Sequence, residues 1–188
     1  MYSGPRVIAF CVFILTIGYG QNTNPTASQL EAMERFASKP TAQVAWSKEI
    51  DRIDTDQAHA VITALGLDDR TQTPQQMRGV RIDLTGANLN DRVYTSEDLL
   101  ERLIRALDEI SNGPPDFHAR VAVGRSSCFG SGVFWQQGGH AFSASQCFFP
   151  DWSGLSVDTG SANFRFTALD PSSFAAVIAR ARDELKKH

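Results

Sequence analysis

The pattern of hydrophobic and polar positions divides the chain into a first half that predicts helices and a second half that predicts strands. In the first half, apolar residues recur every three or four positions, as they do on one face of a helix. This spacing predicts helices at residues 29–37, 41–53, 55–65 and 96–111. Strict alternation at 80–84 predicts one strand among them, with Val80, Ile82 and Leu84 pointing inward.

The last of these helices has the clearest signal. Thr95 or Ser96 can cap it, and Glu97 and Asp98 are acidic residues in its first turn, where they favour a helix. Its apolar stripe consists of Leu99, Leu100, Leu103, Ile104, Leu107 and Ile110. Asn112, Gly113 and two prolines end it, and they mark the boundary between the two halves.

The second half has short apolar runs separated by turn residues, which predicts an antiparallel sheet. The expected strands lie at 117–124, 132–136, 140–149, 155–157 and 163–169. Asp170 and Pro171 then predict the start of a final helix, because aspartate is a good cap and proline suits the first helical position. The predicted fold class is therefore α+β, with N-terminal helices followed by a mainly antiparallel sheet and a C-terminal helix packed on that sheet.

The first twenty residues have the layout of a secretory signal peptide. An uncharged apolar run at 7–19 follows a short basic start, and Gly18 and Gly20 precede a cleavage position before Gln21. The alternative is a membrane anchor that is not cleaved, but a span needs about 20 apolar residues. We therefore expect a signal peptide at 1–20, a tether at 21–28 and one α+β domain at 29–188. Within that domain, 29–112 is mostly helical, and 116–188 holds the sheet and the final helix.

Two cysteines remain after the leader, Cys128 and Cys147. In an exported chain two cysteines most simply pair, and a loop of this size contributes about 3 kcal/mol to stability. The alternative is a pair of free buried thiols. The predicted address is the periplasm or the exterior of the cell.

Composition narrows the function classes. Charged residues make up 21% of the chain and the net charge is −3, without a basic face, so nucleic acid is not an expected partner. No phosphate-binding glycine loop or paired Cys-x-x-Cys is present, so no cofactor and no metal site are predicted. Asp83, Asn88, Asn90 and Asp91 are oxygen-bearing, but their spacing does not match a calcium loop and favours turns.

The segment from Cys128 to Cys147 resembles the first disulfide loop of trypsin-like serine proteases, with Cys-Phe-Gly-Ser-Gly at its start and Ser-Ala-Ser-Gln-Cys at its end. That resemblance would put the general base of the family at Gln146, which cannot accept a proton from a serine. No Gly-Asp-Ser-Gly-Gly nucleophile follows. The chemistry therefore excludes an active protease of this class.

A second segment, Asp158-Thr159-Gly160-Ser161, resembles the active-site turn of pepsin-like aspartic proteases. That chemistry needs two such aspartates that share a proton, and only Asp158 occurs in this context. A dimer could supply the second one, but the residues after the motif predict mostly helix where retroviral-type enzymes have a flap and a further strand.

The second half has more aromatic residues than one small sheet face needs, which favours a binding surface. We expect contact at the exposed parts of the hairpins, 136–140 and 151–154. The predicted binding residues are Gln136, Gln137, His140, Asp151 and Trp152. The leading hypothesis is an exported, non-enzymatic protein that binds another protein, with no membrane contact after signal cleavage. The partner would be an effector or an envelope enzyme, as for a periplasmic inhibitor or an immunity protein that neutralises a toxic hydrolase.

The alternative is a small exported hydrolase that uses His140 or His118 with a nearby aspartate. Its candidate carboxylates are Asp116, Asp151 and Asp158. This hypothesis requires at least two of these groups to meet in one pocket. A structural component of the envelope is a third option.

Overall fold

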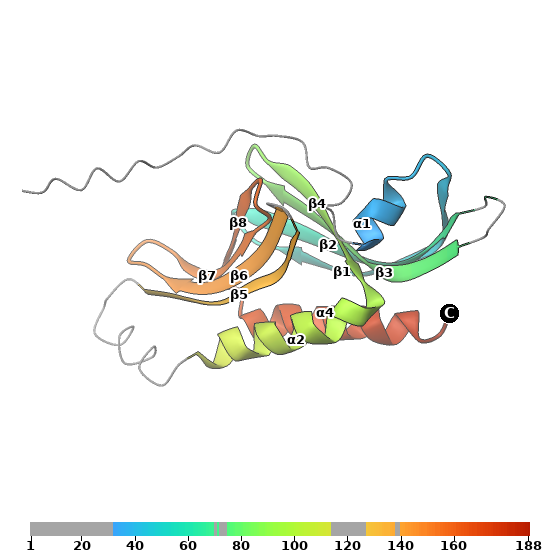
Figure 1. Ribbon diagram of the computed structural model, residues 1–188. Helices are drawn as coiled ribbons and strands as arrows, with labels where there is room; N and C mark the ends of the chain where they lie inside the picture. The colour runs from blue at the N-terminus through green and yellow to red at the C-terminus, as the bar shows by residue number, and fades with distance from the viewer. Residues whose placement is uncertain (1–31, 70, 72–74, 114–126, 138–139) are drawn as a thin grey trace, which may run out of the picture.

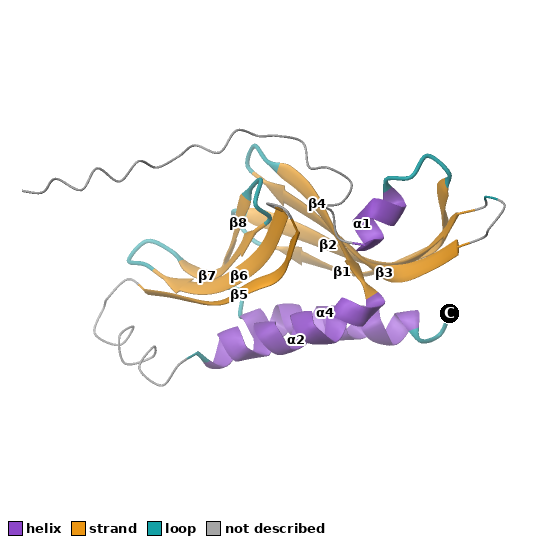
Figure 2. Cartoon of the chain, in the orientation of Figure 1, coloured by secondary structure: helices purple, strands orange, loops and turns teal. Residues whose placement is uncertain are grey.

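A computed structural model shows two antiparallel sheets above a pair of helices (Figures 1 and 2). The structure describes residues 32–69, 71, 75–113, 127–137 and 140–188. Each sheet has four strands in chain order. The first sheet contains β1 (Ala42–Asp54), β2 (Ala58–Asp69), β3 (Gln75–Gly86) and β4 (Asn90–Ser96), and the second contains β5 (Ser127–Gln137), β6 (His140–Phe148), β7 (Ser153–Asp158) and β8 (Asn163–Thr167). The described helices are α1 (Ala32–Ala37), α2 (Glu97–Asn112) and α4 (Pro171–Leu185).

The helix-first layout expected from the sequence is wrong, because residues 41–53 and 55–65 belong to strands β1 and β2. The register of β1 shifts twice, between Val44 and Trp46 and between Glu49 and Asp51. Each shift changes the side on which the following residues lie, so the apolar residues of β1 are spaced as if on a helix. In β2, all residues at 62–67 are buried, so that strand lacks the alternation of a half-exposed strand.

Other predicted elements are confirmed. The strand at 80–84 lies within β3, and the helix at 96–111 is α2. In the second half the predicted strands match β5 to β8, apart from 117–124, which lies outside the described residues. Helix α4 begins as expected, because Asp170 accepts a hydrogen bond of 2.8 Å from the Ser172 backbone N–H and Pro171 is the first helical residue.

The described chain repeats one order of elements: four strands and then a helix. The two helices bury residues at the same spacing: Leu100, Leu103, Ile104 and Leu107 in α2, and Phe174, Val177, Ile178 and Ala181 in α4. Each helix packs mainly on the sheet of the other half. Helix α2 contacts β5 and β6 most and β3 and β4 less, whereas α4 contacts β1, β2 and β3 (Figure 1). The expected packing of the C-terminal helix on the sheet of the second half is therefore wrong, because its main contacts are with the first sheet.

One core joins the two halves. It lies between the inner faces of both sheets and the apolar faces of α2 and α4. Its most deeply buried large side chains include Ile62, Ile82, Leu84, Leu100, Leu103, Phe142, Phe164, Phe166 and Phe174. The opposite faces of the sheets, which we call the outer faces, do not contribute to this core.

Helix α1 covers one end of the outer face of the first sheet. Met33 and Phe36 pack there against Leu65 and Leu67 of β2. The backbone of β3 approaches closely at Gly79, where a Cβ atom would lie 2.1 Å from the Met33 sulfur. Within the described residues, no helix has the length and apolarity needed to cross a membrane. The predicted signal peptide and tether lie outside those residues.

Candidate binding surface

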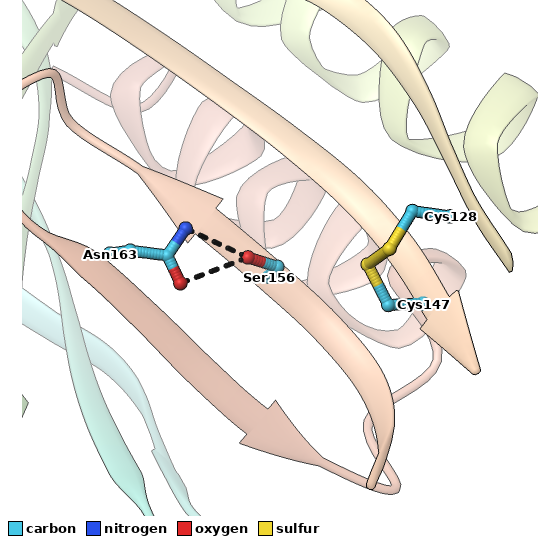
Figure 3. Close-up of a disulfide and its surroundings, with 4 residues drawn as sticks. All are labelled: Cys128, Cys147, Ser156 and Asn163. Carbon is cyan, nitrogen blue, oxygen red and sulfur yellow. Dashed lines mark hydrogen bonds between the residues drawn. A yellow bond between two sulfur atoms is a disulfide. The ribbon is translucent and has the colours of Figure 1, made fainter. Parts of the chain in front are cut away.

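The predicted disulfide is present and joins the two strands of one hairpin. Cys128 on β5 and Cys147 on β6 are directly opposite each other, with Cα atoms 4.1 Å apart and an S–S bond of 2.08 Å (Figure 3). Cys147 is buried and Cys128 is exposed. The bond fixes the pairing of β5 with β6.

The predicted binding residues do not form one surface. Gln136, Gln137 and His140 lie at the end of the β5–β6 hairpin, where Gln137 pairs with His140. Asp151 and Trp152 lie beyond the other end of β6, in the turn that leads to β7. A strand from His140 to Phe148 separates the two groups by about 27 Å at the usual rise per residue.

The turn between β6 and β7 exposes one aromatic ring, that of Phe149, beside a buried tryptophan at one end of the second sheet. We call Phe149, Pro150, Asp151 and Trp152 the aromatic turn. The Phe149 N–H donates to the Trp152 carbonyl at 2.7 Å, which closes the turn. The two rings stack with centroids 5.9 Å apart, and Phe149 remains 44% exposed. Pro150 and Asp151 are also exposed.

Arg165 extends this cluster from β8. Its guanidinium lies over the Trp152 ring, 5.6 Å from the centroid, in a cation–π contact. Trp152 is only 7% exposed, and its indole nitrogen has no hydrogen-bond partner among the described residues. Arginine is among the residue types most enriched at binding hot spots, and the buried Trp152 ring holds the exposed Arg165 in place. Sequence reasoning found Trp152 but missed Arg165, because one arginine on a strand is indistinguishable from an ordinary surface charge.

The outer face of the second sheet continues the surface with small polar residues. Ser145 of β6, Ser156 of β7 and Arg165 of β8 are neighbours across the strands. Ser156 and Asn163 exchange hydrogen bonds of 3.2 and 3.0 Å (Figure 3). This face therefore offers hydroxyl and amide groups along β7 and β8, from the end near the aromatic turn to the opposite end of the sheet.

Comparisons with protein-family models, with curated proteins and with solved structures found no match. The function must therefore be inferred from the chemistry of the surface itself.

The groups of the hydrolase hypothesis are not brought together in the described part of the chain. His140 and Asp151 lie at opposite ends of β6. Asp158 accepts a hydrogen bond of 2.7 Å from the Gly160 N–H, so its carboxylate shapes a turn. His118 and Asp116 lie outside the described residues. Among the described residues, no three potential ligands cluster as a metal site would require.

The Asp158–Ser161 turn fastens the second sheet to the first. Thr159 and Ser161 both donate to one carboxylate oxygen of Asp91, each at 2.6 Å. The other oxygen of Asp91 accepts from the Arg92 N–H at 2.7 Å. All these contacts are structural, and no sequence signal connects two groups so far apart in the chain.

One open cavity of about 680 Å³ lies at the first turn of α2. Its lining consists of Ala32, Gln76, Met77, Arg78, Ser96, Glu97, Asp98 and His188. Arg78 pairs with Glu97 at 2.9 Å and donates to the Leu185 carbonyl at 3.2 Å. Because its main charges neutralise each other, this cavity is a weaker candidate than the aromatic turn.

Proposed function

We propose that this chain is exported and binds another protein through the aromatic turn and Arg165. The observation that carries the proposal is the exposed Phe149 ring beside the Trp152–Arg165 stack. Burying a phenylalanine side chain at an interface contributes about 1.5–3 kcal/mol, and the flanking polar face suits a solvated rim. The surface is a projecting turn beside a sheet face, which fits a broad protein partner better than a small ligand.

The leader pattern and the disulfide support export to the periplasm or the exterior. Disulfides persist in oxidising compartments and are rare in the cytosol. An inhibitor or immunity protein that neutralises a toxic hydrolase is exported to one of these locations and has a rigid binding surface. The partner in this proposal is an effector or an envelope enzyme.

Site-specific photo-crosslinking tests the binding surface. A photoreactive phenylalanine analogue at position 149 should crosslink one partner from the envelope fraction, and unlabelled protein should compete with that product. The matched control is Val44 on β1, which is 55% exposed and far from the turn in sequence. Equal products at both positions, or none at 149, would contradict the proposal.

Cell fractionation tests the proposed location of the protein separately. The mature chain should appear outside the cytosol, shorter than the 20.6 kDa precursor by the leader peptide. A cytosolic product of full precursor mass with free thiols would contradict export while leaving the binding surface untested by that result.

A further inference from the structure

We infer that Arg81 and Arg92, on the outer face of the first sheet, form a binding site for the carboxylate side chain of an acidic protein segment. This site is separate from the aromatic turn and does not depend on it. We call these two residues the arginine pair.

Strand register places the arginine pair and its neighbours on one face. Asp83 of β3 is directly opposite Arg92 of β4, and Arg81 is directly opposite Tyr94. The alternate residues Val80, Ile82 and Leu84 point into the core. The side chains of Arg81, Asp83, Arg92 and Tyr94 therefore gather on the outer face, where none of them is fully buried.

One carboxylate holds both arginines. Asp83 accepts from Arg81 Nε at 2.8 Å through one oxygen and from Arg92 Nε at 2.5 Å through the other. Two positive charges therefore share one negative charge, which leaves a net charge of about +1. Both contacts use Nε, so Asp83 does not occupy the terminal Nη groups. Those groups can pair in a bidentate manner with a second carboxylate.

The other acidic side chains of this outer face lie away from the arginine pair. Glu49 lies 3.7 Å from Arg52, and Asp54 contacts His59 Nδ1 at 2.9 Å. Both carboxylates are on β1, two strands from Arg81 and three from Arg92, so the positive charge at the arginine pair is a local excess. Asp83 also orients both guanidiniums before a ligand arrives, which lowers the entropic cost of binding.

The surroundings favour a carboxylate over a more highly charged anion. The hydrogen bond from Asp83 raises the pKa of Arg92 above its usual value, with a smaller contribution from Tyr94, so the site stays cationic. A single carboxylate would balance the net charge of the site. A doubly charged phosphate would leave an excess of negative charge beside Asp83. Aspartate and glutamate side chains on a protein partner supply the required group.

Nuclear magnetic resonance titration with hexaglutamate tests this site. The Nε–H signals of Arg81 and Arg92 should shift in a saturable way, and rising salt should weaken the binding because part of the site is exposed. The R92Q variant should bind about tenfold more weakly, since one arm of the bidentate pair is lost. The R81Q/R92Q double variant should lose the response.

Three controls keep the test specific. R102Q removes an exposed arginine on α2 and should bind hexaglutamate as the unchanged protein does. F149A should also retain the response, so failure of the aromatic-turn proposal would not affect this one. Circular dichroism and the resonances of α4 report whether each variant is folded. Unchanged binding by a folded R81Q/R92Q variant, no shift with hexaglutamate, or a larger response to inorganic phosphate at equal concentration would overturn the inference.

Discussion

At the scale of single residues, Glu184 connects the final helix to the first strand. Its carboxylate accepts from Lys187 at 2.7 Å and lies 2.9 Å from Lys48 of β1. These contacts, chiefly the hydrogen bond from Lys187 and then that from Lys48, lower the pKa of Glu184 to about 2. The folded pKa is below the ordinary value of 4.5, so the charged form stabilises the fold above that pH.

We therefore expect an acid-dependent loss of stability that involves Glu184. Stability should fall as the pH decreases from about 4.5 to about 2, and E184Q should be less stable than the unchanged protein at pH 7. Urea unfolding of both proteins at pH 7 and pH 2.5 measures this, with the exposed Asp56 between β1 and β2 replaced in D56N as the control. The difference between E184Q and the unchanged protein should shrink at the lower pH. A difference that does not depend on pH would contradict the assignment.

Gly79 provides a second test at this scale. A Cβ atom there would lie 2.1 Å from the Met33 sulfur and 2.2 Å from the Thr95 carbonyl oxygen, and the backbone contact cannot be relieved by a side-chain rotation. We expect G79A to lose about 1–3 kcal/mol in the free energy of unfolding. At Gly86 the nearest atom would be 3.6 Å away, so G86A is the matched control and should change stability much less. Similar losses in both variants would contradict the packing of α1 on β3.

At the scale of elements, the predictions succeeded where local signals agree. Helix α4 has a capping aspartate, a first-turn proline and a regular apolar stripe, and the β5–β6 hairpin has turn residues and paired cysteines. The identity of β1 was missed because its two register shifts disturb the alternation. Strand β2 was also mistaken for a helix, because it is buried on both faces and so lacks the alternation of apolar and polar residues. Such features depend on neighbouring elements and have no local sequence signature.

The disulfide should stabilise the β5–β6 hairpin. Removing a cross-link of this kind costs about 2–4 kcal/mol, mainly through the greater freedom of the unfolded chain. We expect C128S/C147S, or the reduced protein, to unfold at a lower urea concentration than the oxidised protein. Tryptophan fluorescence measured through a urea series checks this. Identical midpoints with and without reductant would mean that the bond contributes nothing to stability.

At the scale of the whole molecule, each half needs a helix from the other half to cover the inner face of its sheet. Helix α4 packs on β1, β2 and β3 of the first sheet, and α2 packs mainly on β5 and β6 of the second. Neither contact is visible in the sequence, because equal apolar stripes on the two helices do not specify which sheet each one covers. The candidate site was likewise found only in part: the aromatic residues indicated Trp152, whereas Arg165 and the arginine pair required strand register.

This dependence predicts the behaviour of fragments. Residues 32–113 lack α4, so the inner faces of β1, β2 and β3 would be exposed to water, and this fragment should not fold alone. Mixing it with residues 114–188 should restore structure. Hydrogen exchange of the core amides of β2 measures the effect. If the β2 amides of the isolated 32–113 fragment were fully protected from hydrogen exchange, the two halves would not share one core.

The central proposal concerns the surface: the exposed Phe149 and Arg165, held by the buried Trp152 ring, would contact a protein partner. Titration calorimetry with the partner isolated by crosslinking at position 149 tests it most directly. We expect F149A to weaken binding at least about tenfold, equivalent to about 1.4 kcal/mol, and V44A to leave it unchanged. Equal affinities for F149A and V44A would show that the aromatic turn is not the contact.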